Sequence, residues 1–264
     1  MRVIVTRPAP QAGTWVNGLR AAGLNAVSLP LIEIAGPPQP AAVIAAWQRL
    51  ASFDALMFVS ANAVQQFFAL QPQDLHVSDF SARFFVTGPG SVNALLAAGV
   101  ARGQIDAPDA LAAQFDSEAL WAVVQARVHS GSRVLIVRGN TGAQSADEST
   151  TATGVGRDWF AARLAGQGAA VELLVAYERR APLLSANALA LVQVAAVDGS
   201  VWLFSSSEAV TNLGSAAAGQ SWSQARAVAT HPRIASAARE AGFAVVCESR
   251  PAMADLVASI ESLA

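Results

Sequence analysis

The sequence predicts an α/β protein of two similar domains, each built on a parallel sheet flanked by helices. Runs rich in β-branched residues alternate with alanine-rich helical patterns along the chain. The strand-like runs are almost continuously apolar, which is typical of parallel strands buried on both faces. Several motifs also recur in the same order in the second half of the chain, and 264 residues suffice for two domains of about 100–150 residues.

Each element is assigned from its own pattern, in chain order. Strands are assigned to short apolar runs such as RVIVT at 2–6. The strand candidates are 2–6, 26–34, 55–60, 83–87, 133–138, 170–177, 201–205, 226–230 and 243–247. Helices are assigned to longer amphipathic segments, several of which end at a glycine. The helix candidates are 10–22, 41–51, 62–70, 90–98, 116–128, 157–167, 185–195, 208–217, 233–241 and 252–262.

The recurring motifs indicate an internal duplication. The matching pairs are 2–7 with 133–138, 58–64 with 204–210, and 83–87 with 226–230. The second pair aligns Ser60 with Ser206, each where a strand-like run gives way to a helical pattern. By themselves, these repeats indicate two similar domains divided near residue 130.

Composition excludes several classes of function. The net charge is −2, and no basic stripe interleaved with aromatic residues suggests a nucleic-acid binder. All 17 basic residues are arginines, which excludes lysine Schiff-base chemistry and a Walker A lysine. The single cysteine, Cys247, excludes an internal disulfide and is interpreted as a small core residue. Neither a secretory signal nor a membrane-length apolar run is evident, so we expect a soluble cytoplasmic protein.

Familiar catalytic motifs are also missing from the sequence. The three histidines, His76, His129 and His231, are scattered, and no Gly-x-Ser-x-Gly elbow occurs. No cluster of acidic residues or histidines predicts a metal site.

Polar residues follow six of the predicted strands. These junctions are Thr6-Arg7-Pro8, Ser60-Ala61-Asn62, Thr87-Gly88-Pro89-Gly90, Arg138-Gly139-Asn140, Ser205-Ser206-Ser207 and Thr230-His231-Pro232-Arg233. Ser, Thr and Asn are preferred helix N-caps, so capping explains any one of them. In parallel α/β sheets, however, ligands bind outside the carboxyl ends of the strands, where helix N-termini offer free N–H groups. The six junctions together therefore also predict a donor-lined surface suited to a polyanion.

Two further features allow alternative interpretations. The polar segment 140–156 is expected to be a mobile loop or, alternatively, a lid. Tyr177, the single tyrosine, is interpreted either as an amphipathic residue at a sheet edge or as a functional group. It lies on an extended segment that ends at Ala181-Pro182, as 27–34 ends at Gly36-Pro37-Pro38, and both segments suit interdomain connections.

The ordered motifs resemble the uroporphyrinogen-III synthase family along the whole chain. The matching stretches are VIVTRPAPQA at 3–12, LPLIEI at 29–34, FVSANAV at 58–64, VTGPGSVNAL at 86–95, VLIVRGNTG at 134–142, GRDWFAARLAGQGAAVELLVAYERR at 156–180, FSSSEAV at 204–210 and RIASAAREAGF at 233–243. Each motif is loose by itself, but their order and spacing are specific. The long 140–156 segment is atypical of the family.

The resemblance implies a different division into domains from the repeats alone. Residues 1–34 and 181–264 would form one discontinuous α/β domain, and 41–173 the other. Extended linkers at 35–40 and 174–180 would join them, with the active site in a cleft between the domains. Ser206 and Ser60 would then face each other across this cleft.

The resemblance also implies the reaction. Hydroxymethylbilane, which carries eight carboxylates, would be cyclised to uroporphyrinogen III with inversion of ring D through a spiro intermediate. No cofactor and no metal are implied, and a monomer is expected, with at most transient contact with neighbouring enzymes of tetrapyrrole biosynthesis. Catalysis would rest on folding the substrate and stabilising charge.

The family's tyrosine that assists departure of the hydroxyl falls on Tyr177, the catalytic candidate. We expect the strand-end residues to bind substrate, namely Arg7, Ser60, Asn62, Thr87, Gly88, Arg138, Ser205, Ser206, Thr230 and His231. His231 stands where the family usually has glycine, which either prevents a tight backbone approach there or adds a donor. The rival hypothesis is a non-catalytic two-domain sensor that closes on an anionic small molecule.

Overall fold

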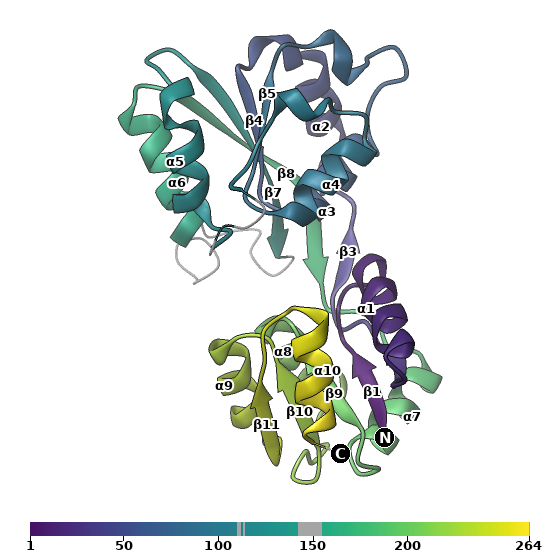
Figure 1. The fold of residues 1–264 in the computed structure, drawn as a ribbon. Helices are drawn as coiled ribbons and strands as arrows, with labels where there is room; N and C mark the ends of the chain where they lie inside the picture. Colours follow the sequence, from purple (N-terminus) through teal and green to yellow (C-terminus); the bar gives the residue numbers. More distant parts are fainter. Residues whose placement is uncertain (110–111, 113, 142–154, 264) are drawn as a thin grey trace. The chain divides into compact units, whose positions relative to one another are not determined.

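The computed structural model describes residues 1–109, 112, 114–141 and 155–263, which fall into two compact α/β units (Figure 1). Unit 1 contains Met1–Glu33 and Arg180–Ala264, and unit 2 contains Ile34–Arg179. Unit 1 is therefore discontinuous in sequence, and unit 2 is one continuous segment. Within the described residues, no helix is both long and apolar enough to cross a membrane.

Unit 1 is a parallel five-stranded sheet, sheet A, with helices on both faces. Its strand order is β2-β1-β9-β10-β11. The strands are β1 (Arg2–Val5), β2 (Asn25–Ser28), β9 (Val201–Phe204), β10 (Arg226–Ala229) and β11 (Val245–Glu248). The helices are α1 (Ala9–Ala21), α7 (Ala186–Ala195), α8 (Ser207–Ala216), α9 (Pro232–Glu240) and α10 (Met253–Glu261). This is the order 2-1-3-4-5 of doubly wound proteins, in which ligands bind where the chain reverses direction across the sheet, here between β1 and β9.

The alternation of side chains along β9 separates the two cores of unit 1. Val201 and Leu203 pack with α1 and α10 on one face, and both are fully buried. Trp202 and Phe204 point to the other face, where their rings contact that of Phe243. The indole N–H of Trp202 donates to the carbonyl of Ala195 at the end of α7, which satisfies its one polar atom.

Unit 2 is a six-stranded mixed sheet, sheet B, in the order β3-β8-β7-β4-β5-β6. The strands are β3 (Glu33–Ala35), β4 (Ala55–Phe58), β5 (Arg83–Val86), β6 (Ile105–Asp106), β7 (Arg133–Thr141) and β8 (Ala170–Arg180). The α-helices are α2 (Pro40–Gln48), α3 (Ala61–Phe68), α4 (Pro89–Ala97), α5 (Ser117–Val124) and α6 (Val155–Gly166). Short 3-10 helices cover Leu50–Ser52, Val77–Asp79, Arg102–Gln104 and Gln125–Arg127.

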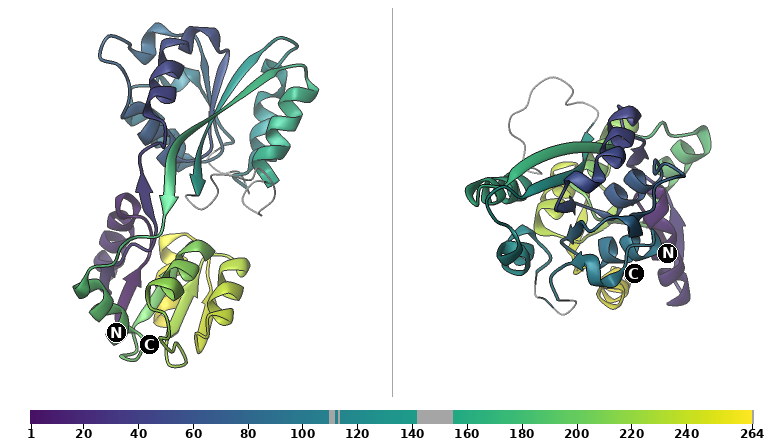
Figure 2. Two further views of the ribbon diagram at one scale, coloured as in Figure 1. Left: turned by 180° about the vertical axis from the view of Figure 1, so that it is seen from behind. Right: turned by 90° about the horizontal axis from the view of Figure 1, so that it is seen from above.

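The helices of unit 2 cover both faces of sheet B (Figures 1 and 2). Helices α2, α3 and α4 enclose a core rich in aromatic rings, in which Phe58, Phe67 and Trp47 are fully buried. Helices α5 and α6 cover the opposite face, where Phe160 contacts Trp121 edge to face. We refer to the first side as the α3 face of sheet B.

The two units place their repeated motifs at equivalent positions. Strands β1, β9 and β10 of sheet A correspond to β7, β4 and β5 of sheet B, in the same spatial order. Their register agrees as well, since Phe204 pairs with Ala229 as Phe58 pairs with Val86. The predicted pair of similar α/β units is thereby confirmed. The order along the chain differs, however, because β1 and α1 precede the other repeated strands in unit 1, whereas the matching β7 and α6 follow them in unit 2.

The structure differs from the sequence prediction in three places. The single strand expected at 26–34 is two strands of different sheets, β2 and β3, because Pro30 between them has no N–H to donate to a ladder. Strand β6 has only two residues, too few for a recognisable pattern. Segment 174–179, which the resemblance assigned to a linker, lies in β8 and pairs with β7.

The expected loop at 140–156 lies mostly outside the described residues. Asn140 and Thr141 belong to the end of β7, and α6 begins at Val155. Residues 142–154, and with them the question of a loop or a lid, are not described by the structure.

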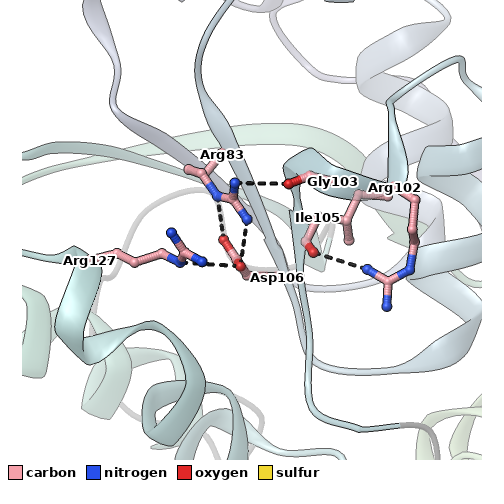
Figure 3. A network of polar contacts seen from close by, with 6 residues as sticks. All are labelled: Arg83, Arg102, Gly103, Ile105, Asp106 and Arg127. Atoms are coloured by element: carbon pink, nitrogen blue, oxygen red, sulfur yellow. Dashed lines mark hydrogen bonds and ion pairs between the residues drawn. The ribbon is translucent and has the colours of Figure 1, made fainter.

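Arginines anchor the amino ends of the strands. In unit 2, Nε and Nη2 of Arg83 each donate to a carboxylate oxygen of Asp106 at 2.7 Å, and Arg127 Nε lies 3.4 Å from the same carboxylate (Figure 3). The hydrogen bond to Asp106 raises the pKa of the Arg83 guanidinium. In unit 1, Arg2 pairs with Asp198 at 3.6 Å, also at an amino end. These contacts fix strand positions at the edge opposite to the predicted site.

Candidate active site

In unit 2, the carboxyl edge of sheet B brings Tyr177 and Ser60 together. Their hydroxyl oxygens lie 3.1 Å apart, within hydrogen-bond distance, although 117 residues separate them. Ser60 is the N-cap of α3, and its Oγ accepts the backbone N–H of Ala63 at 3.2 Å. The tyrosine side chain is 5% exposed and belongs to the core on the α3 face.

A β-bulge determines on which face Tyr177 lies. Leu174 and Ala176 pack on the α3 face, so strict alternation would send the next residue to the opposite side. The register between β7 and β8 shifts, because Arg138 pairs with Val175 whereas Gly139 pairs with Tyr177. Ala176 is the extra residue, and the bulge keeps Tyr177 on the α3 face beside Ser60.

Gly139 leaves the space that the tyrosine ring occupies. A Cβ atom on Gly139 would lie 2.2 Å from Cζ of Tyr177 and within 2.6 Å of both Cε atoms. No side chain fits at that distance, so the ring lies directly over the glycine backbone.

Further predicted residues lie along the same edge. Thr87 follows β5 and is half-buried, and Asn62 is buried in the first turn of α3. Gly88 is the N-cap of α4 in an extended conformation with φ −149°, and a Cβ there would make only ordinary contact, 3.6 Å from Phe115. Its backbone therefore does not require glycine.

Arg138, in the carboxyl-terminal half of β7, carries a buried donor. Its Nε has no hydrogen-bond partner within the part of the chain that the structure describes. An unsatisfied buried donor costs roughly 1–3 kcal/mol, which an incoming acceptor would recover. A carboxylate is the acceptor that a guanidinium binds best.

In unit 1, the end of β1 is followed by a structural threonine and a half-buried arginine. Thr6 is buried, and its hydroxyl donates to the carbonyl of Leu203 at 2.8 Å, so it ties β1 to β9. Arg7 donates to the side-chain oxygen of Gln11 and lies 4.4 Å over the ring of Trp15. Burial lowers the pKa of the Arg7 guanidinium, and its hydrogen-bond acceptor, the side-chain oxygen of Gln11, is neutral.

The ends of β9 and β10 supply Ser205, Ser206, Thr230 and His231. Ser205 and Ser206 are half-buried, and Ser206 is the N-cap of α8 without a capping bond from its own side chain. The backbone N–H of Thr230 donates to the carbonyl of Phe204 and so continues the ladder. Of the two serines that the repeat aligns, Ser60 alone caps its helix through the hydroxyl.

His231 acts as a helix cap. Its Nδ1 accepts the backbone N–H of Arg233 at 3.1 Å, and its backbone is extended with φ −161°, which any residue adopts. A neutral imidazole that accepts at Nδ1 carries its proton on Nε2, so this exposed side chain presents a donor. Glycine is not required at this position.

The sequence model of the family described as "Uroporphyrinogen-III synthase HemD" matches residues 13–258. The chain belongs to the uroporphyrinogen-III synthase family. The curated uroporphyrinogen-III synthase of Synechococcus elongatus is 31% identical over 183 residues, which cover 68% of this chain and 61% of that protein. The one from Salmonella typhimurium is 34% identical over 158 residues, which cover 58% of this chain and also 61% of that protein.

Solved structures of the uroporphyrinogen-III synthase family share the fold. The Helicobacter pylori uroporphyrinogen-III synthetase aligns over all of both chains with a TM-score of 0.60 at 14% sequence identity. Family membership favours an enzyme over the sensor hypothesis. The curated relatives are matched over less than two thirds of their length, so the activity of this chain is argued below from its own residues.

One residue of the candidate site in this uroporphyrinogen-III synthase family member, Gly139, is not among the predicted binding residues. The sequence predicts a polar junction at Arg138-Gly139-Asn140 but assigns no separate role to Gly139. The available signal was a glycine at the end of a strand pattern, which often marks a bulge or a close approach. Among the described residues, no group of three or more metal-ligating side chains occurs.

Proposed function

We propose that this protein is a uroporphyrinogen-III synthase that cyclises hydroxymethylbilane with inversion of ring D. The hydrogen-bonded pair of Tyr177 and Ser60 is the observation that carries the proposal beyond family membership. It places a phenol at the carboxyl edge of a parallel strand array, where doubly wound proteins bind ligands. A phenol there is suited to protonate a departing hydroxyl group.

The reaction begins with loss of the terminal hydroxyl of hydroxymethylbilane. Tyr177 donates its phenolic proton to that hydroxyl, the C–O bond breaks, and water leaves with the bonding electron pair. The cation that remains is an azafulvenium ion, which the substituted carbon of ring D attacks to form the spiro intermediate. Fragmentation and reclosure then invert the ring, and the proton released on rearomatisation returns to the phenolate.

The remaining strand-end residues are proposed to bind the carboxylates of the substrate. In unit 2, Arg138 offers its buried guanidinium Nε, and in unit 1 Arg7 offers a charge held over Trp15. Hydroxyl and N–H donors at Asn62, Thr87, Gly88, Ser205, Ser206, Thr230 and His231 complete the set, whereas Ser60 is taken up below through its contact with Tyr177. Each good charge-assisted bond to a carboxylate contributes about 1.5–3 kcal/mol.

The isomer of the product tests this function. Purified protein is mixed with freshly prepared hydroxymethylbilane, and the uroporphyrinogens are oxidised and separated by chromatography. We expect mainly the type III isomer, whereas the spontaneous reaction gives type I. Product that is entirely type I at every protein concentration would show that the chain does not catalyse this reaction.

Cytoplasmic location and a monomeric state are also part of the proposal. Both are proposed from the membership of the chain in the uroporphyrinogen-III synthase family. Sedimentation velocity with and without substrate analogue measures the oligomeric state, and a single species of 27.2 kDa is expected.

A further inference from the structure

We propose that Ser60 positions Tyr177 by donating its hydroxyl hydrogen to the phenol oxygen, so that the phenolic proton stays available to the substrate. This inference rests on the proposed function, in which Tyr177 is the general acid. It gives Ser60 a role different from substrate binding, because Ser60 acts through the tyrosine.

The hydrogen-bond inventory of the two hydroxyls supports this direction. Ser60 Oγ contacts the N–H of Ala63 at 3.2 Å and Tyr177 Oη at 3.1 Å. Because the N–H of Ala63 can only donate, Ser60 already accepts one bond, and its own hydrogen remains to be given. Accepting a bond polarises the serine O–H and makes it a better donor to the phenol oxygen. In the proposed arrangement, the hydrogen bonds run from the Ala63 amide through Ser60 to Tyr177, the direction that leaves the phenolic proton for the substrate.

The position of Ser60 at a helix N-terminus strengthens the effect. The eight-residue helix α3 begins directly after Ser60, and its N-terminus carries partial positive charge. When Tyr177 gives up its proton, the phenolate receives the serine hydrogen bond in this favourable field. The arrangement is therefore complementary to the charge that develops during departure of the hydroxyl.

The bulge in β8 and Gly139 hold Tyr177 in contact with Ser60. Ala176 is the extra residue in β8 that keeps Tyr177 on the α3 face, and Gly139 lets the ring lie flat against β7. The ring is enclosed by the same core as Phe58 and Val137, which are fully buried. Few rotamers of the Tyr177 side chain remain, so its phenol oxygen is held within hydrogen-bond distance of Ser60.

Because Tyr177 is the only tyrosine, vibrational spectroscopy reads its hydrogen bond directly. In Raman spectra excited off resonance, the intensity ratio of the higher- to the lower-frequency component of the tyrosine Fermi doublet is high when the phenol accepts and low when it donates. In the substrate-free protein we expect a high ratio that falls in Ser60→Gly. Glycine is chosen because it is nearly as good an N-cap as serine, so α3 should persist. A low ratio in the wild type, or one that Ser60→Gly leaves unchanged, would overturn the proposal.

Two variants separate the hydroxyl from helix capping. Ser60→Thr keeps a hydroxyl and should restore the high ratio. Ser185→Ala removes an equivalent cap, since Ser185 Oγ accepts the N–H of Ala188 at 3.2 Å at the start of α7. This control should leave both the Raman ratio and turnover unchanged, and a matching fall in Ser185→Ala would assign the effect to capping.

Kinetics with hydroxymethylbilane distinguish positioning from binding. In Ser60→Gly we expect kcat to fall about tenfold, the rate factor of one hydrogen bond, with KM nearly constant. A raised KM with unchanged kcat would make Ser60 a substrate-binding residue and overturn the positioning role. If the wild type makes no type III product but the Raman result holds, the proposed function fails while the hydrogen-bond arrangement stands.

Discussion

The ring of Tyr177 lies over the α-carbon of Gly139, so closely that a Cβ atom there would sit 2.2 Å from Cζ. The two residues are cross-strand partners only because β8 contains a bulge. Gly139 and the bulge in β8 together therefore determine the position of the Tyr177 phenol. The pattern of polar residues in the sequence indicates neither of them.

Gly139→Ala should displace the Tyr177 ring. The added methyl group overpacks the edge of the sheet, so we expect the free energy of unfolding to fall by about 1–3 kcal/mol in urea titrations. Turnover should fall as well, because the phenol leaves Ser60. Gly214→Ala is the matched control in α8, where nothing lies within 4 Å of the new Cβ, and it should stabilise by about 0.5–1 kcal/mol. Equal kcat in Gly139→Ala and the wild type would contradict this account.

Tyr177→Phe should remove the general acid and keep the fold. We expect kcat to fall by about 10²–10⁴-fold, the usual contribution of a positioned acid. The free energy of unfolding should change by only about 0.5–1.5 kcal/mol, because one hydrogen bond, to Ser60, is lost. Stopped-flow assays with hydroxymethylbilane measure the rate, and an unchanged kcat would make Tyr177 a structural residue.

Arg138→Met should weaken substrate binding without destabilising the free protein. Methionine fills a similar volume and removes a buried N–H that lacks a partner among the described residues, so stability should stay the same or rise. Loss of a charge-assisted bond to a carboxylate should raise KM by about 10–100-fold.

Arg83→Met is the control for Arg138, because Arg83 lies at the amino end of β5. Within the described residues, the substitution leaves the buried carboxylate of Asp106 with the 3.4 Å contact to Arg127 as its remaining ion pair. We expect a loss of about 1–3 kcal/mol in unfolding free energy and no change in KM. Similar KM values for the two variants would show that Arg138 does not contribute to substrate binding.

His231→Ala and His231→Asn should differ in stability. Alanine removes the cap on α9 and should cost about 1 kcal/mol, whereas asparagine can accept the same Arg233 N–H. Thermal unfolding followed by circular dichroism compares the two variants. Identical Tm values would show that the imidazole does not stabilise the helix.

The elements that could be predicted from sequence are those with local signals. Apolar runs located the strands, glycines marked helix ends, and the repeat aligned Ser60 with Ser206. The contacts that decide the site are not local. Ser60 and Tyr177 are 117 residues apart in sequence, and the bulge at Ala176 reverses the face that alternation assigns to Tyr177.

Other differences have equally physical causes. Pro30 divides one apolar run between two sheets, because it cannot continue a ladder. The repeat predicts a serine N-cap at both Ser60 and Ser206, but only the conformation of each side chain decides whether the cap is made. Sequence similarity between the repeats therefore predicts the position of a residue in the fold better than it predicts the hydrogen bonds of its side chain.

The insertion of unit 2 within unit 1 has a consequence for synthesis on the ribosome. The bond from Thr6 to the Leu203 carbonyl joins residues 197 positions apart, so the first strand of unit 1 emerges long before its neighbour β9. Unit 2 is complete in sequence by Arg179 and contains all the strands of its own sheet. Unit 2 can therefore fold while the chain is still being synthesised. Strand β1 can pair with β9 only after the C-terminal segment has been made, and contacts between residues so far apart in sequence form slowly.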